Sequence, residues 1–194
     1  IAKKLGNTLC APIIKFVPEG NIEPPSGAML FPGSISLRAE TYHMLLDDIA
    51  SSLKQSGFKN IIFIGDSGGN QKGMEIVAKK LNQRWSGSGV LAHYIPEYYN
   101  PGWEETERFT KEVLGVEETS NDGHHDDIWV TAMMMVTDPE QVRHQQRIDA
   151  GLASINGVDI TPIGETTELG RKMLEFRAEF TADAILKAIQ SSKQ

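Results

Sequence analysis

Apolar residues are arranged in two patterns along the chain. Apolar residues at three- and four-residue intervals predict helices, over residues 38–55, 71–85, 104–114, 128–136, 139–150 and 166–190. Continuous apolar runs at 60–65 and 90–95 are typical of buried strands. The apolar run at 8–17 predicts a further strand, with Pro12 at a sheet edge or an irregularity. Strands that alternate with helices indicate parallel βαβ units, and hence an α/β fold.

Between these elements lie three stretches with the composition of loops. Residues 18–32 are rich in proline and glycine, residues 65–70 form a short turn between a strand and a helix, and residues 116–127 are polar. In parallel sheets, ligands bind at the carboxyl ends of strands. We therefore expect the turn and the cluster at 122–127 to meet at one rim of the sheet. We expect Ser36 to cap the helix at 38–55, which Gly57 would end.

Length and charge narrow the class of protein. The 194 residues are about one domain's worth, so we expect a single domain over 1–194. The net charge of −7 argues against nucleic acid as a partner. The sequence contains no apolar run of about 20 residues, which is the length that a membrane span needs. The single Cys10 excludes a disulfide framework, and its apolar neighbours predict a buried thiol. We expect a soluble protein. Because the chain starts at Ile1 and not at methionine, a bacterial-type cytoplasm and a periplasm are both compatible with it.

The turn at 65–70 is the first candidate for chemistry. Gly68 and Gly69 allow a sharp change of direction, and amides at a helix start can bind an anion. Asp66 would bind a metal ion or orient a partner. The alternative is a tight strand-to-helix turn in which Asn70 caps the helix.

The second candidate is a group of ionisable side chains just before the helix at 128–136. Asp122, His124, His125, Asp126 and Asp127 lie within six residues. Imidazoles and carboxylates together suit zinc, manganese or iron, and they also suit proton transfer near neutral pH. The alternative is a solvated loop in which Asp126 or Asp127 begins the helix. On the helices at 38–55 and 139–150, His43 and His144 are expected at the surface or as caps, whereas strand residue His93 is expected to be packed.

Several segments also stand in a characteristic order. Residues 31–37 read FPGSISL, before Glu40-Thr41, and residues 57–70 read GFKNIIFIGDSGGN. Further on come HHDDIWVT at 124–131, PEQV at 139–142 and the stretch 157–170. In this order and spacing the chain resembles the creatininase (creatinine amidohydrolase) family, whose members carry FPGTISL, NGHGGN, HAGExETS and PExV. The resemblance is strongest for a subgroup whose turn reads GDSGGN.

The resemblance implies a three-layer α/β/α domain with a mainly parallel sheet, assembled as a homo-oligomer. It also implies hydrolysis of an amide-type C–N bond in a small molecule, with divalent zinc or manganese. This chain departs from the family pattern, because Ala28 and Ser67 stand where the family has histidine, and Trp129 where it has glutamate. His124 is in register, and Asp127 replaces a glutamate. The family's first metal-binding motif would precede residue 8, so we expect a domain that is short at its N-terminus.

The resulting prediction is a metal-dependent amidohydrolase. We expect Asp66, His124, Asp126 and Asp127 to bind the metal, and His124 and His125 to act in catalysis. The expected substrate-binding residues are Gly68, Gly69, Asn70 and Trp129.

Two alternatives remain open. One is a serine hydrolase of the GDS type, with Ser67 as the nucleophile, His125 as its base and Asp122 orienting that base. The other is a non-catalytic relative that binds a small ligand and needs no metal.

Overall fold

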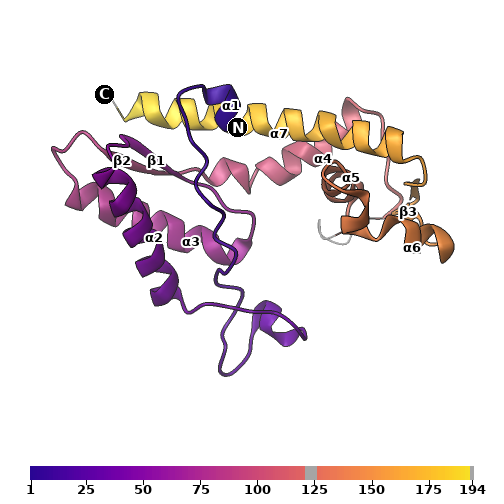
Figure 1. The fold of residues 1–194 in the computed structure, drawn as a ribbon, viewed down its shortest axis with the longest axis horizontal. Helices are drawn as coiled ribbons and strands as arrows, with labels where there is room; N and C mark the ends of the chain where they lie inside the picture. The colour runs from indigo at the N-terminus through magenta and orange to yellow at the C-terminus, as the bar shows by residue number, and fades with distance from the viewer. Residues whose placement is uncertain (121–125, 193–194) are drawn as a thin grey trace. The chain divides into compact units, whose positions relative to one another are not determined.

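A computed structural model describes residues 1–120 and 126–192 and shows a mixed α/β fold (Figure 1). The chain divides into two compact units, and each is described by itself. Unit 1 consists of Ile1–Tyr99 and Thr181–Gln194, and unit 2 consists of Asn100–Phe180. Within the described ranges, no helix combines the length and the apolar character needed to cross a membrane.

Unit 1 contains the predicted parallel strands. β1 (Asn60–Phe63) pairs with β2 (Leu91–Tyr94), and Ile61 lies opposite Ala92. The strands are joined through α3 (Gly68–Arg84), and α2 (Ala39–Gln55) precedes β1. The prediction of a βαβ unit is therefore confirmed. Gly57, which follows the last turn of α2, has a φ of 94°, a conformation that glycine adopts without steric cost and that ends the helix there.

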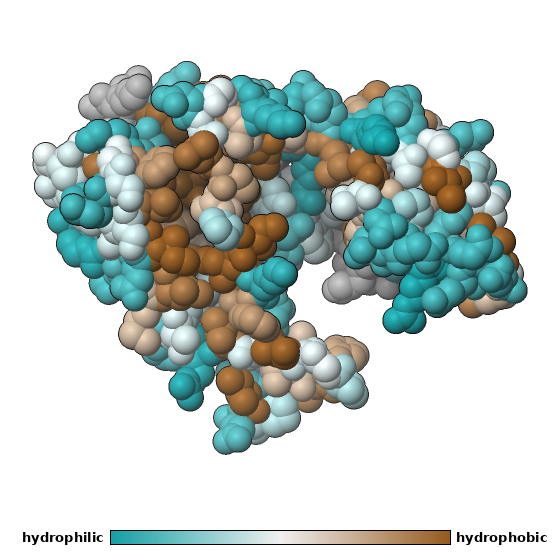
Figure 2. Space-filling view, viewed as in Figure 1, coloured by the Kyte–Doolittle hydropathy of each residue, from teal (hydrophilic) through white to brown (hydrophobic). Residues whose placement is uncertain are grey.

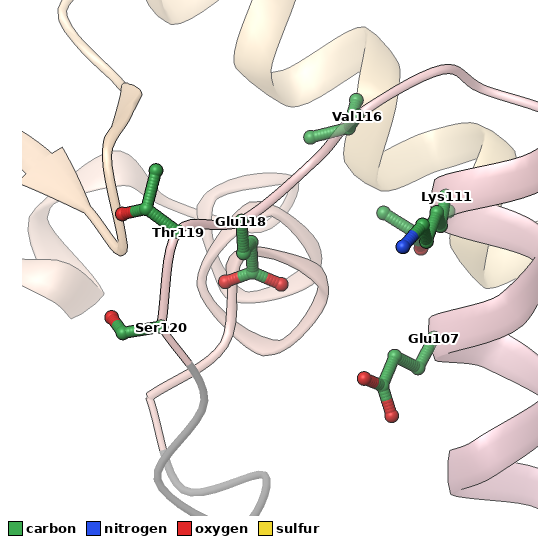
Figure 3. Close-up of a pocket in the computed structure, with 7 residues that line it drawn as sticks. Glu107, Lys111, Val116, Glu118, Thr119 and Ser120 are labelled. Atoms are coloured by element: carbon green, nitrogen blue, oxygen red, sulfur yellow. The ribbon is translucent and has the colours of Figure 1, made fainter.

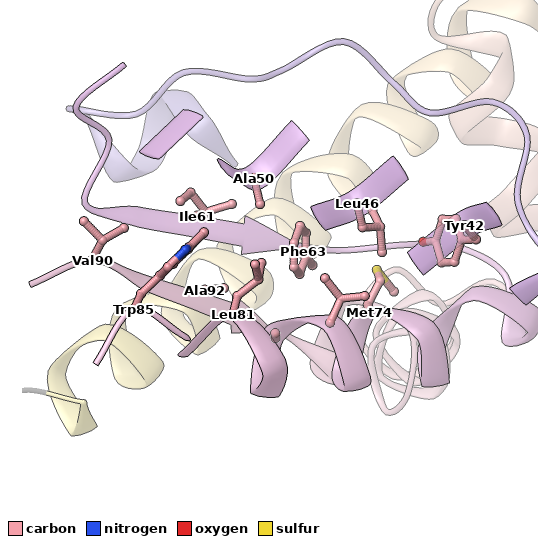
Figure 4. Packing of buried hydrophobic residues seen from close by; sticks show 12 residues of the cluster. Tyr42, Leu46, Ala50, Ile61, Phe63, Met74, Leu81, Trp85, Val90 and Ala92 are labelled. Atoms are coloured by element: carbon pink, nitrogen blue, oxygen red, sulfur yellow. The ribbon is translucent and has the colours of Figure 1, made fainter. Parts of the chain in front are cut away.

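The core of unit 1 lies between α2, α3 and the two strands (Figure 4). Side chains at helical spacing on α2 and α3 meet alternate side chains of β1. The most buried members are Tyr42, Leu46, Ala50, Ile61, Phe63, Met74, Val77, Ala78, Leu81, Trp85, Val90 and Ala92. Burial of this apolar surface is the main force that holds the helices on the strands.

The N-terminal part of unit 1 differs from the prediction. It contains only α1 (Ala2–Leu5) and the 3₁₀ helix η1 (Gly27–Leu30), and residues 8–17 form no strand. Pro12 has no N–H to donate to a ladder, and Leu9 and Ile13 are 76% and 82% exposed. Cys10 is exposed as well, so the expectation of a buried thiol is wrong.

Residues 17–37 form a loop that is closed by hydrogen bonds at its neck. Leu37 N donates to Val17 O at 3.2 Å. Ser36 Oγ accepts from Glu19 N at 2.9 Å and donates to Gly20 O at 2.7 Å. Ser36 thus ties the loop together, and the prediction that it caps α2 is wrong, because the cap position belongs to Arg38.

Beyond β2, unit 1 continues through the short 3₁₀ helix η2 (Pro96–Tyr98). Unit 2 is mainly helical, and α7 contributes residues to both units. The elements of the second half are α4 (Gly102–Glu112), α5 (Ile128–Met135), η3 (Pro139–Val142), α6 (His144–Asp149), β3 (Ser154–Ile155), β4 (Val158–Asp159) and α7 (Ile163–Ser191).

Two details of unit 2 differ from the prediction. The helix expected over 139–150 is split into η3 and α6 at Arg143, whose φ is 53°. The antiparallel pair of β3 and β4 is an additional element that we did not predict. The larger helices of unit 2 are confirmed.

α5 is the central helix of unit 2, because it contributes to two apolar clusters. Ile128 and Met135 pack with Ile155 and Ile160, and Trp129 packs in the second cluster with Ala132 and Met173. His144 lies next to the first cluster, 2% exposed, with its Nε2 2.8 Å from Ile160 O. The expectation that His144 is a surface or capping residue is therefore wrong.

Candidate functional site

The glycine turn (residues 65–70) leads from β1 into α3 in unit 1. Ser67 is the N-cap of α3, and its Oγ accepts a hydrogen bond from Gly69 N at 3.3 Å. The helix begins at Gly68, so Asn70 lies inside its first turn, where it is buried. The turn does contain a helix cap, as the structural alternative expects, but the cap is Ser67 and the expectation that Asn70 caps the helix is wrong.

The side chain of Gln71 forms hydrogen bonds within the glycine turn. Its Nε2 lies 2.9 Å from Gly65 O, 2.8 Å from Ser67 O and 2.8 Å from Asn70 Oδ1. Its Oε1 accepts a hydrogen bond from Tyr94 Oη at 3.0 Å. Because Tyr94 is the last residue of β2, Gln71 links the ends of both strands to the start of α3.

The two glycines of the turn have different surroundings. A Cβ placed on Gly69 would overlap the carbonyl oxygen of Pro18, whereas a Cβ on Gly68 would lie 3.2 Å from Tyr99 Oη. Gly69 thus lets the neck of the 17–37 loop come close to α3. Asp66 is exposed beside them. Metal binding by Asp66 and ligand binding by Gly68, Gly69 and Asn70 stay predictions.

The second predicted segment lies in unit 2. Asp122, His124 and His125 lie outside the described residues, and Asp126 is exposed. Asp127 is the N-cap residue of α5, as predicted, and it is 0% exposed.

The carboxylate of Asp127 does not cap its own helix. Oδ2 accepts from Trp129 Nε1 at 3.3 Å, and Oδ1 lies 3.5 Å from Asn156 Nδ2.

Glu118 supplies the helix cap that Asp127 does not. Glu118 Oε1 accepts from Ile128 N at 2.8 Å and from Asn156 Nδ2 at 2.9 Å. Burial raises the pKa of Glu118, the carboxylates of Asp127 and Glu107 raise it further, and the two hydrogen bonds oppose that rise. We call Glu118 and Asp127 the acidic pair, since one amide nitrogen lies within hydrogen-bond distance of both.

The turn between β3 and β4 brings that amide to the acidic pair. Asn156 and Gly157 have φ angles of 48° and 87°, as in the tight turns that Asn-Gly favours. Thr119 N and Oγ1 donate to Asn156 O at 2.8 and 2.9 Å, and Ser120 Oγ donates to Asn156 Oδ1 at 3.0 Å. Sequence reasoning missed Glu118 and Asn156, although the Asn-Gly dipeptide is a known signal for a hairpin.

A cavity of ≈ 180 Å³ adjoins Glu118 (Figure 3). Glu118, Thr119 and Ser120 line one side of it, and Glu107 and Lys111 of α4 line the other. The lining is mostly polar and contains both signs of charge. The cavity has room for a small polar molecule.

Comparison with known families decides the class of protein. The creatininase family model, described as creatinine amidohydrolase, matches residues 1–185. This chain belongs to the creatininase family. Membership implies an amidohydrolase-type activity, which in this family is typically metal-dependent. A search of curated proteins found no match.

The acidic pair would supply two carboxylates to a metal site. Two carboxylates held close together repel each other, and a divalent cation would relieve that repulsion. Within residues 1–120 and 126–192, no group of three histidine, cysteine or acidic side chains could hold a metal ion. The glycine turn and the acidic pair belong to different units, so the predicted meeting of the two segments stays a prediction.

Proposed function

We propose that this creatininase-family chain is a metal-dependent hydrolase of an amide C–N bond in a small molecule, and that the acidic pair is part of its metal site. The observation that carries the proposal is the buried carboxylate of Asp127, which shares the Asn156 amide with Glu118. Asp127 also stands where family members have a glutamate. A fully buried carboxylate beside a second one is costly unless a cation or donors compensate for it.

Each residue of the site has a distinct task in this proposal. Asp127 and Glu118 would hold the metal, while Asn156 and Trp129 orient Asp127. A bound divalent zinc or manganese ion supplies an activated water and polarises the carbonyl group of the substrate. His124, Asp66 and Asp126 are the further ligands that we propose from the sequence, and His125 is the proposed proton carrier.

The cavity beside Glu118 is the proposed substrate pocket. Its volume of ≈ 180 Å³ suits a small cyclic amide. Thr119 and Ser120 offer hydroxyl groups, and Lys111 offers an ammonium group, for the polar atoms of such a substrate. Gly68, Gly69 and Asn70 remain the substrate contacts proposed from the sequence, whereas Trp129, also expected to bind substrate, is 2% exposed and directs its indole N–H to Asp127.

We also propose a homo-oligomer built from single three-layer α/β/α domains. The support is the N-terminal segment of unit 1, where Leu9, Ile13, Leu30, Phe31 and Ile35 are all more than 60% exposed. Hydrophobic residues are prominent on the part of unit 1 where this segment runs (Figure 2). Large apolar patches on a surface mark association sites. Sedimentation of the purified protein tests this, and a monomer at all concentrations would contradict it.

The main experiment compares hydrolysis with and without metal. The purified chain is treated with a chelator, reconstituted with Zn²⁺ or Mn²⁺, and assayed on creatinine and other small cyclic amides. The test variant is Asp127→Asn, and the matched control is Asp149→Asn, which changes an exposed carboxylate in the same unit.

We expect metal-dependent hydrolysis in the wild type. Asp127→Asn should lower it by about 100-fold or more, because loss of a ligand exceeds the effect of losing an outer contact. Asp149→Asn should keep the wild-type rate. Less than about one tenth of an equivalent of bound metal, together with no turnover, would contradict the proposal, since a catalytic site needs about three protein ligands to retain its ion.

A further inference from the structure

The indole ring of Trp129 packs in the core of unit 2 and hydrogen-bonds to Asp127. Trp129 is 2% exposed, and its Nε1 donates to Asp127 Oδ2 at 3.3 Å. The guanidinium carbon of Arg177 lies 5.6 Å from the centre of the indole ring. Trp103 meets the ring edge to face, with centroids 5.7 Å apart. The indole is therefore held by its neighbours and presents its one polar group to a carboxylate.

This arrangement leaves the carboxylate little rotational freedom. Asp127 is contacted from two directions, by Trp129 at Oδ2 and by Asn156 at Oδ1. Ala132 and Met173 belong to the same apolar cluster as Trp129 and are fully buried, so the ring cannot turn without disturbing the core. A cation over the face of an indole draws electron density from the ring, which makes the N–H a better donor.

The identity of residue 129 matters for the charge of the site. A glutamate here, as in the family pattern, would place a third carboxylate near Glu118 and Asp127. Tryptophan instead contributes a donor and no charge. The site thus gains an orienting hydrogen bond at the position where the family pattern supplies an acid.

We propose that Trp129 is a positioning residue, which holds the Asp127 carboxylate in one orientation through its indole N–H while Arg177 lies against the ring. This inference rests on the proposed function for its metal-binding consequence. The hydrogen bond itself can be measured independently of that function.

The first experiment measures Mn²⁺ affinity by calorimetry in the wild type, Trp129→Phe and Trp85→Phe. Trp85 is a matched control, since it is 6% exposed, lies in unit 1, and has Arg84 5.9 Å from its ring centre. We expect Trp129→Phe to weaken Mn²⁺ binding about 10- to 100-fold, as loss of an outer contact to a ligand typically does. Trp85→Phe should leave it unchanged. Equal affinity in a folded Trp129→Phe protein would overturn the inference.

The second experiment needs neither metal nor activity, and it decides the question if Trp129→Phe fails to fold. The chain has three tryptophans, so a ¹H–¹⁵N spectrum contains three indole signals. Asp127→Asn should move the Trp129 indole proton upfield, because a neutral acceptor is weaker than a carboxylate, and should leave the Trp85 signal in place. An unmoved Trp129 signal overturns the inference. A moved signal in a protein that binds no Mn²⁺ would support the hydrogen bond and refute the proposed function alone.

Discussion

The glycine turn and the start of α5 both begin a helix, yet they satisfy their polar groups in opposite ways. In the glycine turn, neutral groups do the work: Ser67 caps its own helix, and the amide of Gln71 reaches the backbone of the turn. At α5, the carboxylate of the cap residue Asp127 binds the side chain of Trp129 and does not cap the helix, and Glu118 accepts the N–H of Ile128 instead.

The two regions differ in the charge of the groups that form these hydrogen bonds. In the first region, the hydrogen bonds of Ser67 and Gln71 join uncharged groups. The second places two carboxylates around a single amide nitrogen, where burial raises the pKa of Glu118 and the neighbouring carboxylate of Asp127 raises it further. Surplus charge of this kind is more typical of functional sites than of structural turns.

The largest expected effect tests the close approach of the 17–37 loop to the glycine turn. Gly69→Ala should lower the free energy of unfolding by about 1–3 kcal/mol, because the new methyl group would overlap the backbone of Pro18, which cannot move cheaply. Gly68→Ala is the matched control, since only the mobile end of Tyr99 is near it. Urea denaturation measures both. If the two variants are equally stable, the neck of the 17–37 loop does not lie as close to Gly69 as the structure shows.

The next effect compares the same substitution in both regions. Asn156→Asp should cost about 1–3 kcal/mol, because it removes the donor shared by the acidic pair and adds a third negative charge. Asn70→Asp also buries a negative charge, but it keeps the oxygen that accepts from Gln71, and the helix dipole favours a charge in the first turn of α3 by up to about 1 kcal/mol. We therefore expect a smaller loss. Equal losses in thermal unfolding would mean that the two regions do not differ in charge balance.

The parts of the fold that sequence could predict are those set by local pattern. The apolar runs around Ile61 and Ala92 and the helical spacing of α2 and α3 led directly to the βαβ unit. The same kind of pattern places the start of α5 at Asp126 or Asp127, and the structure has it at Asp127. Residues 8–17 show the limit of this reasoning, since an apolar run forms a strand only if a partner strand accepts its hydrogen bonds.

The acidic pair could be predicted only in part. The cluster of ionisable side chains at 122–127 indicates Asp127 together with its acidic neighbours, but it does not include Glu118, which lies in a polar stretch without a motif. Its importance comes from Asn156, which is 38 positions away in the sequence and arrives through a turn between strands of two residues each. Such short strands carry no usable periodicity. A contact of this separation depends on tertiary folding, which one sequence does not reveal.

A smaller effect distinguishes helix capping by Ser67 from its alternative role as the nucleophile of a serine hydrolase. Ser67→Ala should lower the free energy of unfolding by about 1 kcal/mol, as loss of an N-cap usually does. Metal-dependent hydrolysis should remain within about twofold of wild type, because the proposed metal-dependent reaction does not use the Ser67 hydroxyl group. Ser67→Gly serves as the control for capping, since glycine is a tolerable N-cap. Loss of hydrolysis in both variants without loss of stability would favour the serine hydrolase.

The smallest effect concerns how unit 1 responds to acid. His93 in β2 is 7% exposed, with its Nε2 3.0 Å from Asn60 Oδ1. Burial lowers the pKa of His93 below its usual 6.5, so the unfolded chain takes up this proton before the folded chain does. The stabilising contribution of neutral His93 is therefore complete above pH 6.5 and is lost as the pH falls below that value.

Hydrogen exchange of the β2 amides should show opening that becomes easier from pH 7 to pH 5, after correction for intrinsic exchange. His93→Gln keeps a polar partner for Asn60 and should flatten this dependence. If the variant shows the same slope as the wild type, the acid sensitivity of unit 1 comes from groups other than His93.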